Sequence, residues 1–242
     1  MNGAFLNALG ILLGALFGLI RREPLPARTQ EQLRAALGIF IMAAGGWQVW
    51  QNLGAGFGNG LKHLLLTFLA VVLGFWLGKL LGFQRLSNRL GRLAGQYIAA
   101  AQAKPPGPAV AGLVAGLVLF GAAPLGWLGA VQDGCTGWFH LLAAKSLMDA
   151  LAMAGFVRIF GWPVALSAFP ICGILGLLTL ACQRLAVPFC AAHHLLEPVN
   201  AATGLVACLV SLVIFQLRKV ELTNFLPALV VAPLLAWLCG DH

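Results

Sequence analysis

The chain has 242 residues, of which 60% are hydrophobic and only 9% charged, and its formal net charge at pH 7 is +8. A soluble domain carries about 25% charged residues, so this composition excludes one and predicts a polytopic membrane protein. The apolar runs are continuous and of helical length, whereas the strands of outer-membrane barrels alternate apolar and polar residues. The basic residues lie mainly at the ends of these runs, where they act as topology signals, and they indicate no nucleic-acid partner.

We predict an all-α fold, with residues 1–242 forming a single transmembrane domain of about eight helices. The predicted helices are residues 4–20, 33–50, 61–81, 109–131, 138–157, 163–180, 198–217 and 226–239. Between the third and fourth helices, Arg85, Arg89 and Arg92 recur every three or four residues. This spacing predicts an amphipathic helix on the membrane surface.

The fourth helix contains a predicted break. Pro124 removes a backbone donor and Gly126 weakens the next turn. Gly134, in the polar turn that follows, is a third predicted hinge position. Broken helices at membrane depth are tolerated where they face protein or a water-filled cavity, so we expect this one to face the interior.

The fifth helix carries Lys145 near its middle and Asp149 four residues later, on the same helical face. An ionised side chain at that depth costs roughly 2.5–3.5 kcal/mol, so such charges are normally paired and turned inward. The pair indicates a substrate or ion pathway, and the alternative is a structural ion pair that fixes this helix against its neighbours.

Other polar residues are candidates for the same pathway. They are Asn7, Glu31, Gln132, Asp133, Ser146 and Glu197. Each has a structural alternative: Asp133 can cap a helix end, Asn7 and Ser146 can join helices by hydrogen bonds, and the two glutamates can favour the positive ends of helix dipoles. We predict no catalytic residue, metal site or cofactor, because no protease, hydrolase or zinc motif is present in the sequence.

The sequence contains an internal repeat. The run GILLG (10–14) leads to Glu31 and Gly38, and GILG (173–176) leads to Glu197 and Gly204. We therefore predict two three-helix units, residues 4–83 and 163–240, on either side of central helices at 109–157. Five helices separate equivalent positions, so the two copies are predicted to be inverted, a common plan of secondary transporters.

The run GAVQDGCTGWFHLLAAKSLMDA (129–150) resembles the signature of the YqgA-like bacterial membrane proteins, the domain-of-unknown-function 554 family. The matching residues are Gln132, Asp133, Gly134, Gly137, Lys145, Ser146 and Asp149. Trp138 and Ala150 depart from the pattern, the first where the family usually has an acid, which argues against an acid-rich ion site. The resemblance implies a bacterial inner-membrane protein and no particular activity.

Three classes of function follow from these features. The favoured one is a transporter or channel for a small solute or ion, working by alternating access around Lys145 and Asp149. The alternatives are a structural or regulatory membrane protein and, less favoured, an intramembrane enzyme. The expected partners are the lipid bilayer, the unidentified solute and a homo-oligomer. The GxxxG-like faces, such as Gly112 with Gly116 and Gly74 with Gly78, favour a homo-oligomer and packing within the chain equally.

The distribution of basic residues predicts the orientation. With the loops after the first, third, fifth and seventh helices in the cytoplasm, twelve lysines and arginines lie on that side and only Lys62 and Arg184 on the other. The positive-inside rule then places both ends of the chain outside the cytoplasm.

Overall fold

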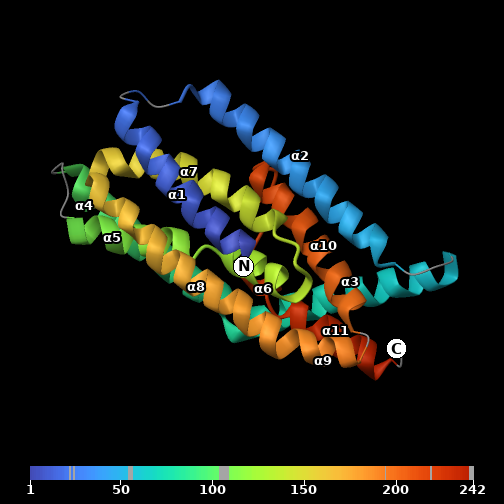
Figure 1. Cartoon of the computed structure of the whole chain (residues 1–242). Coiled ribbons are helices and arrows are strands. Elements are labelled where there is room, and N and C mark those ends of the chain that lie inside the picture. Colours follow the sequence, from blue (N-terminus) through green and yellow to red (C-terminus); the bar gives the residue numbers. More distant parts are fainter. Residues whose placement is uncertain are drawn as a thin grey trace. The chain divides into compact units, whose positions relative to one another are not determined.

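The structure is a computed structural model that describes residues 1–21, 23, 25–53, 57–103, 109–193, 195–218 and 220–239 (Figure 1). The described residues form helices and short connections without a strand, which confirms the all-α class. The elements are α1 (Asn2–Ile20), α2 (Ala27–Gln51), α3 (Phe57–Leu81), α4 (Phe83–Ala103), α5 (Ala109–Gly116), η1 (Leu117–Gly121), α6 (Pro124–Thr136), α7 (His140–Phe160), η2 (Trp162–Ser167), α8 (Ala168–Ala181), η3 (Cys182–Ala186), α9 (Val187–Ala192), α10 (Leu196–Ile214), η4 (Leu222–Phe225) and α11 (Ala228–Leu238).

Six helical stretches of the described chain are long and apolar enough to cross a membrane, and a bent pair raises this number to seven if it counts as one span. They are Asn2–Ile20, Ala27–Gln51, Gly58–Leu81, His140–Phe160, Trp162–Ala192 and Leu196–Ile214. The last predicted span corresponds to a shorter apolar helix, Leu222–Leu238. The membrane-protein class agrees with the prediction, whereas the number eight is not established by length and composition.

The bent pair is the predicted broken helix. Val110–Gly121 and Pro124–Thr136 meet at 56°. A π-helical turn, η1, precedes the break, and Pro124 begins α6, a position where its missing N–H costs little. Gly126 lies in the first turn of α6 and Gly134 lies further along it, so the helix continues through both predicted hinge positions. The chain instead leaves α6 after Thr136 and turns at Gly137, whose φ is 72°.

Contacts divide the chain, which we predicted as one domain, into two compact units of three stretches each. Unit 1 comprises Met1–Ala27, Arg85–Asp133 and Phe139–Leu180, and unit 2 comprises Arg28–Gln84, Gly134–Trp138 and Ala181–His242. Neither unit is one of the sequence repeats. Equivalent helices nevertheless fall in the same unit: α1 with α8 in unit 1, and α2 with α10 and α3 with α11 in unit 2.

In unit 1, α1 packs along α7 through a stripe of glycines (Figure 1). Gly10, Gly14 and Gly18 face Ser146, Ala150 and Ala154 respectively. A Cβ atom on Gly14 would lie 2.6 Å from the Cα atom of Ala150, so only glycine permits this approach. Because the three contacts join residues that are the same number of positions apart in the sequence, the two helices run parallel. The opposite side of α1 exposes large apolar side chains such as Phe5 and Leu13, as expected for a lipid-facing surface.

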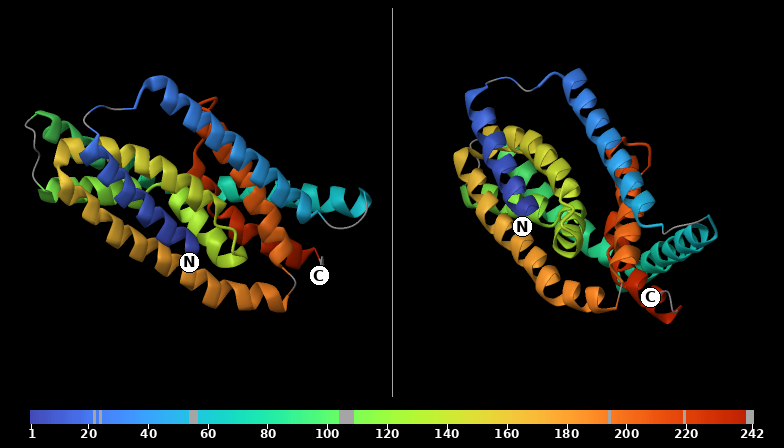
Figure 2. Two further views of the ribbon diagram at one scale, coloured as in Figure 1. Left: turned by 45° about the horizontal axis from the view of Figure 1, so that its top comes forward. Right: turned by 45° about the vertical axis from the view of Figure 1, so that its right-hand side comes forward.

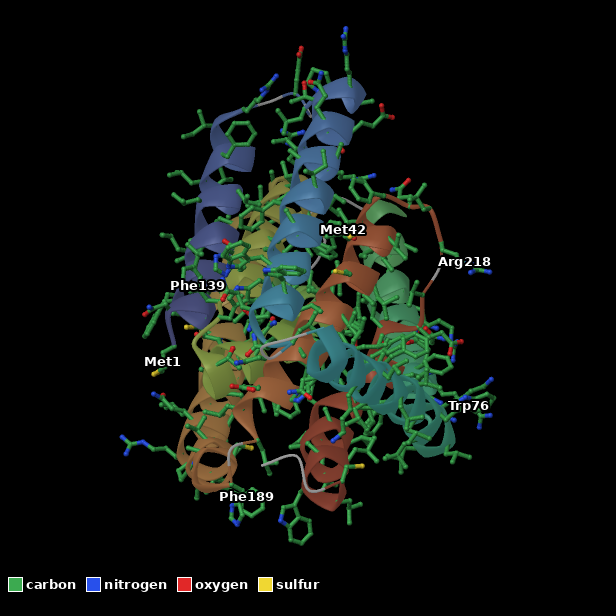
Figure 3. The ribbon with its side chains drawn as sticks, turned by 90° about the vertical axis from the view of Figure 1, so that its right-hand side faces the viewer. Met1, Met42, Trp76, Phe139, Phe189 and Arg218 are labelled. Atoms are coloured by element: carbon green, nitrogen blue, oxygen red, sulfur yellow. The ribbon has the colours of Figure 1, made fainter. Side chains whose placement is uncertain are left out.

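In unit 2, α2 and α10 pack in opposite directions (Figure 2). A Cβ atom on Gly38 would meet the Phe215 ring at 2.6 Å, and one on Gly204 would meet Val49 Cγ2 at 2.8 Å. Each contact therefore joins the middle of one helix to the carboxyl end of the other, which requires the two helices to run antiparallel. Met42 lies between these contacts on the face of α2 toward α10, where its Sδ accepts a hydrogen bond from Ser211 (Figure 3).

The same antiparallel arrangement joins α3 and α11. Gly74 lies against Ala228, and Gly78 lies against Asn224. In unit 1, Gly112 and Gly116 likewise lie against Phe160 and Ser167. Both glycine pairs therefore pack within the chain, which is the second of the two explanations that the sequence offered for them.

Arg158 closes the carboxyl end of α1. Its Nη2 donates hydrogen bonds to the carbonyl oxygens of Arg21 (2.9 Å) and Glu23 (2.8 Å). We expect Arg158→Ala to lower the free energy of unfolding by about 1–3 kcal/mol, because the two carbonyls lose a charged donor. Arg158→Lys should lose less, since its ammonium keeps the charge. Unfolding by SDS titration in mixed micelles measures both losses, and equal losses for the two variants would contradict this capping role.

Candidate functional site

The centre of the candidate site is the ion pair within α7. Lys145 Nζ donates a hydrogen bond to Asp149 Oδ2 on the next turn of the same helix. Lys145 is 1% exposed and Asp149 is 7% exposed. The pair thus lies inside unit 1, in a helix that qualifies as a membrane span. This arrangement agrees with the inward orientation expected from the sequence.

Three other helices of unit 1 enclose the pair. A Cβ atom on Gly126 of α6 would lie 2.9 Å from Lys145 Cε and 3.4 Å from Leu175 of α8, so the lysine stem passes directly over the first turn of α6. On the other side, the Asn7 amide of α1 lies beside the Asp149 carboxylate. Asn7 is fully buried, and within the described chain neither its Nδ2 nor its Oδ1 forms a hydrogen bond of normal geometry. The site therefore holds a buried amide directly beside the carboxylate.

Asp133 forms a separate polar contact in unit 1. Its Oδ2 accepts a hydrogen bond from the Gly3 backbone N–H at 3.2 Å and lies 3.1 Å from the Met1 amine. A carboxylate at the first turn of α1 satisfies a free helix N–H and favours the positive end of the helix dipole. This contact corresponds to the structural alternative for Asp133, with the capped helix being α1.

The remaining predicted residues divide between the two units. Gln132 is fully buried on α6, and Ser146 donates a hydrogen bond to the Leu6 carbonyl oxygen at 2.7 Å, so both lie within unit 1. Glu31 and Glu197 belong to unit 2, and both are exposed. Glu197 lies in the first turn of α10, as expected. Glu31 does not begin a helix, because α2 starts at Ala27, directly after Pro26.

Sequence analysis missed two buried hydroxyl groups in unit 1. Ser167 of η2 is fully buried, and its Oγ has no hydrogen-bond partner within the described chain. Thr179 of α8 is also fully buried and donates a hydrogen bond to the Ala130 carbonyl oxygen of α6 at 3.1 Å. Small hydroxyl residues are common in apolar helices, so the sequence alone gave no reason to single these two out.

Among the described residues, no group of three or more histidine, cysteine, aspartate or glutamate side chains is arranged to hold a metal ion. All six cysteines are free thiols. The chemistry that the buried cluster offers is therefore that of one ammonium, one carboxylate and neutral amides and hydroxyls. Such groups bind and release a small charged or polar solute, or a proton.

Comparison with known proteins identifies the family of the chain. The family model described as "Protein of unknown function (DUF554)" matches residues 2–237, nearly the whole chain. The chain belongs to this family. The resemblance predicted from residues 129–150 is confirmed, and it extends over both units.

Two curated proteins are similar to the chain over almost their full length. "Uncharacterized protein YqgA" of Escherichia coli (strain K12) is 27% identical over 231 residues, which cover 95% of this chain and 94% of that protein. "Uncharacterized membrane protein YdfK" of Bacillus subtilis (strain 168) is 22% identical over 233 residues, which cover 96% of this chain and 94% of that protein. No solved structure matches the chain. The second name agrees with the membrane class that the apolar helices indicate.

Proposed function

We propose that this DUF554 protein is a secondary transporter or channel for a small solute or ion in the bacterial inner membrane, and that it is not an enzyme. The observation that carries the proposal is the buried Lys145–Asp149 pair in a membrane-spanning helix, with the buried amide of Asn7 beside it. Ionisable residues inside membrane spans are rare and usually mark solute, ion or proton pathways.

The packing directions of the helices support an alternating-access plan. The contact of Gly38 with Phe215 is matched by that of Gly204 with Val49. Gly204 stands 166 residues after Gly38, and Phe215 stands 166 residues after Val49. Residues at equivalent positions of the two repeats therefore exchange partners. Reciprocal contacts of this kind are expected across a two-fold axis. Because α2 and α10 run antiparallel, the two repeats would have opposite orientations in the membrane, as in inverted-repeat transporters.

The same directions favour eight crossings. When crossings are numbered along the chain, antiparallel spans have numbers that differ by an odd number, and parallel spans have numbers that differ by an even number. If the bent pair crosses once, α1 and α7 are the first and fifth crossings and α2 and α10 are the second and seventh, which agrees with their contacts. If the bent pair turned back, α2 and α10 would run in the same direction. The basic residues then place both chain ends outside the cytoplasm.

The proposed mechanism uses the neutrality of the ion pair. Within the described part of unit 1, Asp149 is the acidic group that faces Lys145, and α1, α6 and α8 contribute Asn7, Gly126 and Leu175 to the surroundings. A proton or cation that neutralises Asp149 releases the Lys145 ammonium, which can then bind an anionic or polar solute. Release of the solute together with the proton or cation restores the ion pair. The resting site thus carries no net charge in either direction of access.

The proposal is tested by reconstituting the protein in liposomes on a solid-supported membrane and recording currents after concentration jumps. The probes are protons, Na⁺, K⁺, chloride, acetate and inorganic phosphate. We expect wild type to give a current with at least one probe and Asp149→Asn to give none, because an amide cannot accept the proton. Absence of current with every probe, or currents unchanged in Asp149→Asn, would contradict the proposal.

The second candidate is a structural or regulatory membrane protein in which the pair only fixes α7. The close glycine packing of α1 on α7 favours it, because such an interface permits little rearrangement. In that case wild-type liposomes give no current with any of the probes, and removal of the ion pair changes stability alone.

A further inference from the structure

We propose that α4 is a binding site for anionic phospholipids, with its arginines on the lipid phosphates and its exposed leucines in the acyl boundary of the membrane. This inference is independent of the proposed transport function. It rests on the charge, exposure and packing of α4 and on its place directly after a membrane span.

The charged residues of α4 are all arginines. Arg85, Arg89 and Arg92 are exposed, and the described helix contains no acidic residue. At 3.6 residues per turn, their spacing confines the three guanidinium groups to roughly 60° of the helix circumference. The guanidinium group binds phosphate through two parallel hydrogen bonds, which makes arginine the preferred cation for this ligand.

The opposite face of α4 packs against the protein. Ala94 is fully buried, and Tyr97 and Ile98 pack against the hydrophobic core of unit 1. The carboxyl-terminal half of α4 is thereby fixed to the protein, and the arginine stripe points away from it. Helix α4 is therefore anchored to unit 1, and its arginine face is directed outward.

A third face of α4 is apolar and exposed. Leu86 is 57% exposed and Leu93 is 39% exposed. Both lie between the arginine stripe and the packed face, about 70–90° from the centre of the stripe. Exposed leucines beside a row of arginines are typical of helices that lie in the interface with their apolar side in the acyl boundary.

Because α4 follows directly after a membrane span, we expect it to lie at the level of the lipid headgroups. The span Gly58–Leu81 ends directly before it, and Gly82, with φ of 73°, makes the turn between them. The Gln84 backbone N–H is then held by Asn224 Oδ1 at 3.1 Å, at the first turn of α4. The arginines thus follow the end of a span by 4 to 11 residues. An anionic phospholipid surface is the partner of matching charge at that level.

The test is native mass spectrometry of the purified full chain, released from micelles that contain phosphatidylglycerol or phosphatidylcholine. Wild type should retain phosphatidylglycerol in preference to phosphatidylcholine. The variant Arg85→Gln/Arg89→Gln/Arg92→Gln should lose most of this preference. At roughly fivefold per arginine, the expected loss is on the order of 100-fold.

A variant of equal charge provides the matched control. Arg28→Gln/Arg34→Gln/Arg184→Gln removes three exposed arginines from α2 and η3, and it should keep the wild-type preference. Equal loss in both variants would assign the effect to net charge and overturn the proposal, as would a preference unchanged in the α4 variant.

Two further variants address folding and the apolar face. If the triple glutamine variant does not fold, the corresponding triple lysine variant keeps the charge and loses the bidentate geometry, and an intermediate preference is expected. Leu86→Gln/Leu93→Gln should weaken retention of phosphatidylglycerol while leaving the arginines intact. Wild-type retention in this leucine variant together with wild-type retention in the lysine variant would contradict the proposed site.

Discussion

Lys145→Ala is expected to lower the free energy of unfolding by about 3–5 kcal/mol, because it leaves the buried Asp149 carboxylate without its counter-charge. In contrast, Lys145→Met combined with Asp149→Leu should be close to wild type in stability, since apolar residues of similar volume often replace a buried ion pair without loss. Unfolding by SDS titration in mixed micelles measures both free energies.

The double variant separates the two candidate functions. If the pair serves solute movement, this variant should fold normally and give no current in liposomes. If the pair is only structural, the double variant should differ from wild type at most in stability. Arg184→Ala is the control for loss of an exposed charge, and it should change the stability by less than about 0.5 kcal/mol. A double variant as unstable as Lys145→Ala would show that the charges themselves are required for folding.

Gly14→Val is expected to prevent assembly of α1 with α7. Overpacking a protein interior typically costs about 1–3 kcal/mol when side chains can move aside. Here the obstacle is backbone, because the new Cβ atom would lie 2.6 Å from Ala150 Cα and 2.7 Å from its carbonyl carbon. We therefore expect a cost above that range. The measurement is the fraction of protein that elutes as a single species after detergent extraction.

The chain offers matched controls for this substitution. Gly155 on α7 and Gly173 on α8 are exposed helical glycines, and a Cβ atom on either would meet no other atom within 4 Å. Gly155→Val and Gly173→Val change the same atoms and remove the same backbone flexibility. Both should elute like wild type. If all three valine variants aggregate, glycine is required for a reason other than the α1–α7 contact.

The local features of the site were predictable from the sequence, because they depend on helical periodicity. Apolar runs located the spans, and a spacing of four residues placed Lys145 and Asp149 on one face. The recurrence of Gly10, Gly14 and Gly18 at every fourth residue of α1 is typical of a face for close helix contact. Its partner was not predictable, since the residues that receive it on α7, such as Ala150 and Ala154, are small and not distinctive.

Boundaries in polar sequence were predicted less well. The second helix was expected to begin at residue 33, where apolar residues start, but α2 begins at Ala27 in the polar run that precedes them. An α-helix satisfies its own backbone groups in water as in lipid, so its end need not coincide with the edge of the apolar segment. Glu31 therefore lies in the second turn of α2, not at its start. The division into two units was also not predictable, because it depends on which distant helices pack together.

The contact between α1 and α7 has a consequence for biogenesis. Leu6 and Ser146, which share a hydrogen bond, are separated by 140 residues. At roughly 5–20 residues per second, the ribosome completes α7 about 7–28 s after α1 has emerged. During that interval Asn7 and the glycine stripe have no permanent partner, although α1 is already apolar enough to leave the translocon. The nascent chain must therefore keep its first helix available, in lipid or against the insertion machinery, until α7 arrives to complete the site.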